Sequence, residues 1–339
     1  MDFDNIMREI TSGLTGEPEH DIPYLQEQCQ KYKDHELSTE ILRACGRLTF
    51  KLIPEEKKAP LNDLLKKNSM GFEAALEEAH FNIYKKKYDV ALKIVEGVVA
   101  KIKDVPVFAD DSVSEYHTFN ETFEEILYRH IYQPEKDLRP ADPTWTRAFF
   151  LQGNLLFEMQ RYDEAQEALK QALHWNPISS EINFEYIETY KMMGDMDTFF
   201  RLSKDALRFA FKSSDVARCF RNIGFYFVEQ ELYNEAMGCF ELSTLYEESK
   251  TANSEMYYIH QMTEGKATVP TKAEMEKIAE KYGFSMGADD DVLGLSFAYG
   301  KHAYENGHKQ AAIYFWSITY ELTHDDYIKG LLEKCEAME

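Results

Sequence analysis

Hydrophobic residues follow helical spacing along most of the chain. Residues 148–177, AFFLQGNLLFEMQRYDEAQEALKQALHWNP, hold two apolar stripes, one with Phe149 and Leu156 and one with Leu169. Apolar residues recurring every three or four positions indicate amphipathic helices. Pro177 follows the second stripe, where a proline cannot continue a helix. The segment therefore predicts a helix-turn-helix hairpin, with its turn at Gln160-Arg161-Tyr162-Asp163.

Small residues stand at defined places in this hairpin. We expect Gly153 and Ala165 where its two helices touch, because a larger side chain would push them apart. Ala172 falls where the next hairpin would approach.

The pattern recurs along the chain, which is the signature of a repeat architecture. Ala206 follows Ala172 by 34 positions, although Ile187 replaces the first-helix Gly and Phe199 the first Ala of this second unit. Three other units restore parts of the pattern: Phe220, Gly224, Phe227, Tyr233, Ala236 and Phe240; Gly300, Gly307, Ala312 and Trp316; and Ala79, Tyr88, Ala91 and Val95.

This spacing resembles the tetratricopeptide repeat (TPR) family, most clearly over residues 72–105, 146–250 and 293–325. The resemblance implies an all-α fold, a right-handed α-solenoid of helix-turn-helix repeats with helical caps at both ends. It also implies a protein- or peptide-binding role.

The predicted organisation has seven parts. Residues 1–70 read as four short helices punctuated by Pro18, Pro23, Pro54 and Pro60, and form either a cap, a degenerate repeat or a separate helical domain. The other parts are a TPR-like unit at 71–105, an insert with one helix at 106–143, three TPR-like units at 144–250, a divergent helical pair at 251–287, a TPR-like unit at 288–324 and a capping helix at 325–339.

The insert interrupts the array. Its sequence HTFNETFEEILYRHIY, residues 117–132, predicts a helix with Phe119, Phe123 and Leu127 on one apolar stripe. Long connections inside compact structures are often functional. Two alternatives stay open: the helix packs on the outside of the array, or it lies across the concave groove and gates it.

The charge balance limits the choice of partner. The chain has 38 Lys and Arg against 60 Asp and Glu, a net charge of −22. A surface this acidic repels phosphate backbones, which argues against nucleic-acid binding. It favours a basic or mixed-charge partner, unless the acidity serves only solubility.

Cysteine usage and hydropathy indicate a compartment. Five cysteines form no CxxC pair, as expected in a reducing compartment. No stretch approaches the ~20 apolar residues that span a membrane. We therefore expect a cytoplasmic protein.

Catalytic and metal-binding signatures are weak. Gly283-Phe284-Ser285-Met286-Gly287 is a formal GxSxG, but a helix precedes it where a nucleophile elbow needs a strand. Gly283 instead reads as a helix C-cap. The run Asp289–Asp291 lacks the alternation of a calcium loop and reads as a helix start. We predict no enzyme activity, no cofactor and no metal site.

The resemblance places the binding groove on the first helices of the repeats. The groove residues predicted in this way are Arg147, Phe150, Asn154, Phe157, Phe184, Glu188, Lys191, Arg218, Arg221 and Phe225. Some family members clamp the carboxylates of a chaperone tail, and Asn154 and Arg218 match that clamp. Phe150, Glu185 and Asn222 depart from it, and Glu185 would repel a carboxylate.

Two functions follow as hypotheses. The first is a non-enzymatic scaffold that binds a protein or peptide in this aromatic, mixed-charge groove. The alternative is a peptide-responsive regulator, similar to pheromone receptors, whose N-terminal helices act on a target.

Overall fold

The computed structural model describes residues 2–104 and 108–337. The chain forms two compact units that are interleaved in sequence. The first takes Met1–Thr118, Pro134–Leu155 and His174–Asn176, and the second takes Phe119–Gln133, Leu156–Leu173 and Pro177–Glu339. The predicted boundary between residues 105 and 106 lies outside the described residues.

The first unit begins with a three-helix cluster, α1 (Phe3–Ser12), α2 (Pro18–Lys31) and α3 (Ser38–Leu52). It has a core of its own, in which Ile6, Ile10, Leu25, Ile41 and Cys45 are fully buried. The following helix α4 (Glu55–Tyr84) runs through position 70, so the fourth short helix predicted before residue 70 is instead part of a long one. It is paired with α5 (Tyr88–Asp104).

The insert contains two short strands that the sequence analysis did not predict. β1 (Ser114–His117) and β2 (Asp137–Pro140) pair in parallel, with Ser114 opposite Asp137. Side chains of α3 bind the segment that precedes β1, since Arg43 forms a 2.8 Å ion pair with Asp111 and the Ser112 hydroxyl donates to Glu40 at 2.6 Å. The first unit also holds most of α7 (Pro143–Glu158).

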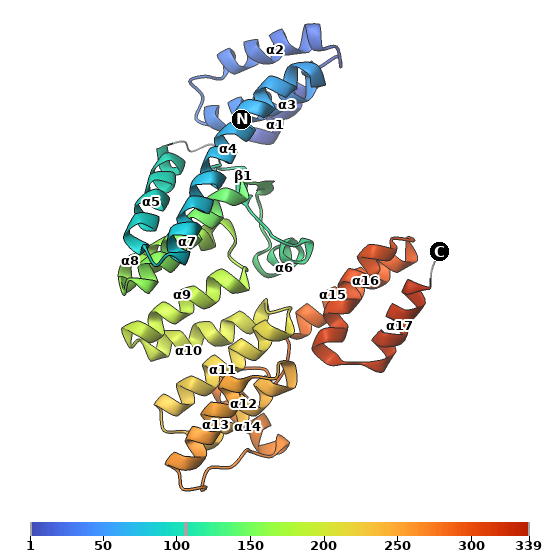
Figure 1. The fold of residues 1–339 in the computed structure, drawn as a ribbon. Helices are drawn as coiled ribbons and strands as arrows, with labels where there is room; N and C mark the ends of the chain where they lie inside the picture. The colour runs from blue at the N-terminus through green and yellow to red at the C-terminus, as the bar shows by residue number, and fades with distance from the viewer. Residues whose placement is uncertain (1, 105–107, 338–339) are drawn as a thin grey trace. The chain divides into compact units, whose positions relative to one another are not determined.

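The second unit is a series of helical hairpins (Figure 1). Its first elements are α6 (Thr122–Tyr132), which starts five residues later than predicted, and most of α8 (Tyr162–Trp175). The rest are α9 (Ser180–Met193), α10 (Met196–Asp205) with a 3₁₀ turn at Ala206–Arg208, α11 (Ser213–Glu229), α12 (Tyr233–Tyr246), α13 (Lys250–Met262), α14 (Lys272–Tyr282), α15 (Asp290–Glu305), α16 (Lys309–Thr323) and α17 (Asp326–Glu336).

The turns inside five hairpins share one backbone geometry. A residue with positive φ stands two positions before each second helix: Lys86, Gln160, Gly194, Glu231 and Gly307. In the turn between α11 and α12, the Glu231 amide donates to Val228 O at 2.9 Å, and the Leu232 amide donates to Phe227 O at 2.8 Å. This double bond pattern is a Schellman motif, which satisfies the last carbonyls of the first helix.

Missing side chains let the two helices of a hairpin approach each other. A Cβ on Gly224 of α11 would lie 3.0 Å from the Phe240 ring of α12. A Cβ on Gly300 of α15 would overlap the Trp316 ring of α16. Both pairs are 16 positions apart, so the same contact recurs in two repeats. The predicted all-α class of helical repeats is confirmed, and no helix among the described residues could cross a membrane.

Candidate functional site

A cavity of about 420 Å³ opens where the first turns of α6, α9 and α11 meet in the second unit. Ser179 starts α9 as its N-cap, and Lys212 directly precedes α11. Three of the ten predicted groove residues line it. Its lining residues are Asn120, Glu121, Glu124, Ser179, Ser180, Glu181, Phe184, Phe211, Lys212, Ser214, Asp215, Arg218 and Arg221.

An aromatic ring and a cation form one wall of the cavity. The Arg218 guanidinium lies 4.7 Å from the centroid of the Phe184 ring, within cation–π range. Arg218 also pairs with Glu185 at 3.2 Å. Phe184 is one of the predicted groove residues, but its side chain is buried, with only 2% of its surface exposed.

The other cations of the cavity also have carboxylate partners. Lys212 pairs with Glu121 at 2.6 Å, and Arg221 pairs with Glu247 at 2.8 Å. The lining residues include four carboxylates (Glu121, Glu124, Glu181 and Asp215) against three cations (Lys212, Arg218 and Arg221). The cavity therefore offers both charge signs beside an apolar ring.

Among the carboxylates that line the cavity, Asp215 lies in an environment that shifts its pKa. Burial raises the pKa of this carboxyl, although the nearby Ser180 and Ser214 side chains and the charges of Lys212 and Arg218 oppose the shift. A binding partner that brings a positive charge close to Asp215 would favour the ionised form of this carboxyl.

Three more predicted residues gather further along the same two helices. The Lys191 ammonium lies 5.0 Å from the Phe225 ring and 5.9 Å from the ring of Phe199, which the prediction had not included in the groove. The two rings meet edge to face, with centroids 6.1 Å apart. Glu188 forms an ion pair with Lys191.

The remaining predicted residues are placed elsewhere. Phe157 is half-buried in the second unit, and its ring meets Tyr162 at 5.4 Å. Arg147, Phe150 and Asn154 belong to the first unit. Arg147 lies between Glu73 and Glu77 of α4, at 4.0 and 3.8 Å. Asn154 and Phe150 are half-buried.

The contribution of α6 to this cavity is not visible in the sequence. Asn120, Glu121 and Glu124 reach the cavity from a segment about sixty positions before α9, and no local pattern predicts that contact. The apolar face of α6 packs within the second unit, where the Phe123 ring lies 5.3 Å from the Phe211 ring and 6.0 Å from the Phe315 ring. The helix thus borders the cavity with its first turn, and its role as a gate stays a hypothesis.

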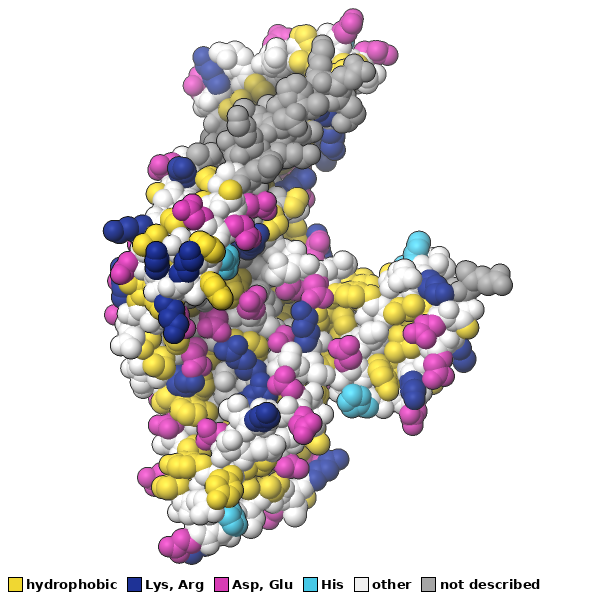
Figure 2. Space-filling model, in the orientation of Figure 1, with side chains coloured by type: hydrophobic (Ala, Val, Ile, Leu, Met, Phe, Trp, Pro, Cys, Tyr) yellow, Lys and Arg dark blue, Asp and Glu magenta, His cyan; other side chains and the backbone are white. Residues whose placement is uncertain are grey.

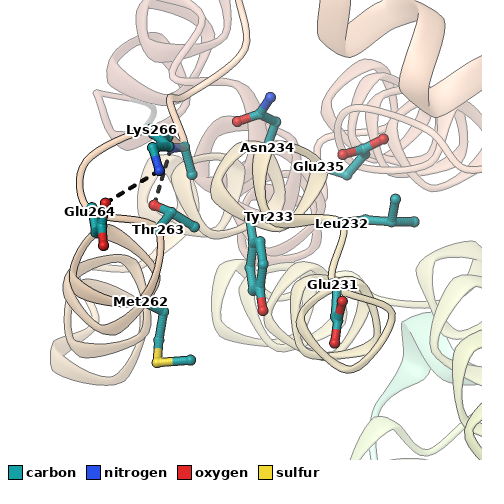
Figure 3. Close-up of a pocket in the computed structure, with 10 residues that line it drawn as sticks. Glu231, Leu232, Tyr233, Asn234, Glu235, Met262, Thr263, Glu264 and Lys266 are labelled. Carbon is teal, nitrogen blue, oxygen red and sulfur yellow. Dashed lines mark hydrogen bonds and ion pairs between the residues drawn. The ribbon is translucent and has the colours of Figure 1, made fainter.

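A second hollow of about 500 Å³ lies at the N-terminal end of α12 (Figure 3). Glu231, Glu235 and Glu264 bring carboxylates to it around the Tyr233 ring. Lys266 is its one lining cation, and it pairs with Glu264 at 3.3 Å.

The motifs set aside from the sequence have ordinary structural roles. Gly283 caps α14 with φ +69°, and the Ser285 hydroxyl donates to Gly287 O at 2.8 Å. Asp289 is the N-cap of α15, as predicted. No cluster of metal-binding side chains occurs within the described part of the chain.

Fold and comparisons agree on the class of the molecule. Its hairpins define an all-α helical-repeat protein. Residues 156–199 match the tetratricopeptide repeat family, so the predicted resemblance is confirmed there. No curated protein matches the chain. Tetratricopeptide repeats generally mediate protein–protein interactions.

Proposed function

We propose that the chain is a non-enzymatic binding module, and that the cavity between α6, α9 and α11 holds a segment of a partner protein. The observation that carries this proposal is the convergence of Phe184, Arg218 and Arg221 on one cavity. Pockets that combine an apolar surface with a few placed polar groups are the usual sites of recognition.

The charges of the cavity indicate the kind of segment. A peptide that carries acidic and basic side chains could exchange its charges with the ion pairs of Arg218 and Arg221, close to the buried Phe184 ring. Arg218, which matches the carboxylate clamp of some TPR proteins, is already paired with Glu185 at 3.2 Å. We therefore favour a mixed-charge segment, whose acidic groups meet Arg218 and Arg221 and whose basic groups meet the displaced carboxylates, over a purely acidic tail.

A charge reversal tests this proposal. The wild-type chain, Arg218→Glu and a matched control, Arg201→Glu, would each be used to purify partners from native extract. Arg201 lies on α10, is exposed and pairs with Asp205 at 3.1 Å, outside the cavity. We expect the partner to be lost with Arg218→Glu and kept with Arg201→Glu. A partner that both variants retain would contradict the proposal, and a small co-purifying peptide would favour the regulator alternative.

A further inference from the structure

A separate apolar groove runs along the opposite part of α12. It measures about 530 Å³ and lies in the second unit, between α12, α14 and the loop that precedes α14. The α12 residues that line it, Gly238, Glu241, Leu242 and Leu245, recur every three or four positions, so they form one face of that helix.

Two methionines and two exposed aliphatic side chains line this groove. Met275 and Met286 contribute to it, and methionine side chains adapt their shape to irregular partners. Leu245 is 63% exposed and Val269 is 42% exposed, both at the groove. Gly238 makes room for the floor, since a Cβ there would lie 2.5 Å from the Met275 sulfur.

The groove continues the acidic hollow of Figure 3 along the same helix. The hollow takes residues 231–235, from the turn before α12 and its first residues, and the groove takes residues 238–245 of the same helix. The helical part, residues 233–245, is about 18 Å long at 1.5 Å per residue. The loop residues Ala267 and Val269, two positions apart, line the hollow and the groove respectively. We call the two together the α12 surface.

Negative charge without partners surrounds the α12 surface. It carries five carboxylates, from Glu231, Glu235, Glu241, Glu264 and Glu276, against the ammonium groups of Lys266 and Lys272. Of these five carboxylates, Glu264 forms an ion pair, with Lys266, and the other four form none with the described part of the chain. Figure 2 shows hydrophobic side chains interleaved with acidic and basic ones on the visible face of the molecule.

We propose that the α12 surface binds a segment of a partner protein that carries large apolar side chains next to lysine or arginine. The apolar side chains enter the groove over Leu242 and Met275, and the basic ones meet the unpaired carboxylates and the Tyr233 ring. A second copy of this chain fits less well, because each copy carries a net charge of −22. This surface differs from the α6–α9–α11 cavity and does not depend on it.

Peptide display on the full chain tests the proposal. A library of random 12-residue peptides would be selected against the wild type, and the enriched peptides would be labelled and titrated by fluorescence anisotropy. We expect enriched sequences with Leu, Ile, Phe or Met beside Lys or Arg. Their affinity should fall about tenfold or more with Leu245→Glu and several-fold with Glu241→Lys, and it should fall with rising salt.

Matched variants separate this surface from the rest of the molecule. The control for Leu245→Glu is Tyr257→Glu, which also puts a carboxylate in place of an exposed apolar side chain, 67% exposed, on α13. The control for Glu241→Lys is Glu333→Lys, at an exposed position of α17. Both lie outside the α12 surface and should leave affinity unchanged. Leu245 is exposed, so its replacement should fold. Four outcomes would overturn the proposal: no enriched peptide, peptides without basic residues, equal binding to Leu245→Glu, or a dimer of the chain that Leu245→Glu dissociates. Peptides lost only with Arg218→Glu would also overturn it, while supporting the α6–α9–α11 cavity.

Discussion

The α9–α10 and α11–α12 hairpins solve the same packing problem in opposite ways. In α11–α12, the small Gly224 faces the large Phe240. The corresponding positions of α9 and α10, also 16 apart, hold Ile187 and Ser203, so here the large residue stands on the first helix and the small one on the second. Ile187 and Ser203 are 1% and 0% exposed, as deeply buried as their counterparts.

This exchange shows that the family's small residue is one solution among several. What the hairpin needs is a pair of complementary volumes across the contact. Phe199, where other repeats have Ala236 or Ala312, adds a second exchange. Its ring reaches Phe225 and Lys191, so the divergent hairpin supplies part of the wall that faces α11.

The largest expected effect on stability comes from replacing Phe199, the residue that stands where other repeats have Ala. Phe199→Ala restores the residue found in other repeats, but Phe199 is fully buried, and the change leaves a cavity. We expect it to lower the free energy of unfolding by about 3–5 kcal/mol in urea denaturation. Ala236→Phe in the neighbouring hairpin is the mirror change and should also destabilise. A stabilising Phe199→Ala would show that the volumes are not complementary.

Placing the α9 residue in α11 tests the first exchange. Gly224→Ile forces a branched side chain onto the Phe240 ring, and overpacking of this kind costs about 1–3 kcal/mol. The double variant Gly224→Ile with Phe240→Ser imitates α9–α10. It should lose less than the sum of the two single changes, by a coupling of about 0.5–3 kcal/mol. Strict additivity in the cycle would contradict the volume-exchange account.

Asp215, in the first turn of α11, should make the stability of the fold depend on pH. Because burial raises the pKa of Asp215, the folded state binds a proton more tightly than the unfolded state. This carboxyl therefore destabilises the fold at neutral pH, and the penalty disappears as pH falls toward the unfolded pKa. Asp215→Asn should raise the urea midpoint at pH 7, with a smaller gain at pH 4.5. A gain that grows on acidification would reverse the assigned sign.

The smallest effects concern the shared turns. Glu231 adopts φ +58° at a position where Gly194 serves α9–α10. Glu231→Gly should stabilise the protein by about 0.5–1 kcal/mol, and Gly194→Ala should destabilise it by a similar amount. Thermal unfolding of both variants checks this, and equal shifts of the same sign would argue against a common turn geometry.

The hairpins and their turns were predictable because they depend on local spacing. Gly224, Phe240 and Gly300 stand where the pattern predicts close contact, and Gly283 caps α14 as expected. The sequence pattern showed that Ile187 replaces the small residue of the first helix. It did not show that the small Ser203 stands at the corresponding position of the second helix.

The insert could not be predicted from its own sequence. β1 and β2 are four residues each and pair across more than twenty positions, and neither shows clear alternation. The placement of α6 depends on Phe211 and Phe315, which lie far along the chain. Because long-range packing also decides which side chains line the cavity, Asn120 and Glu121 line it unexpectedly. Arg147 and Phe150, which were expected in the groove, lie in the other unit.

Site-specific photo-crosslinking tests the central claim most directly. A photoreactive amino acid would replace Glu181, an exposed residue that lines the α6–α9–α11 cavity, and in a control it would replace Arg201 of α10. The account predicts a partner adduct at position 181 that is absent at position 201 and disappears when Arg218→Glu is added. The same adduct at both positions, or one that persists with Arg218→Glu, would contradict it.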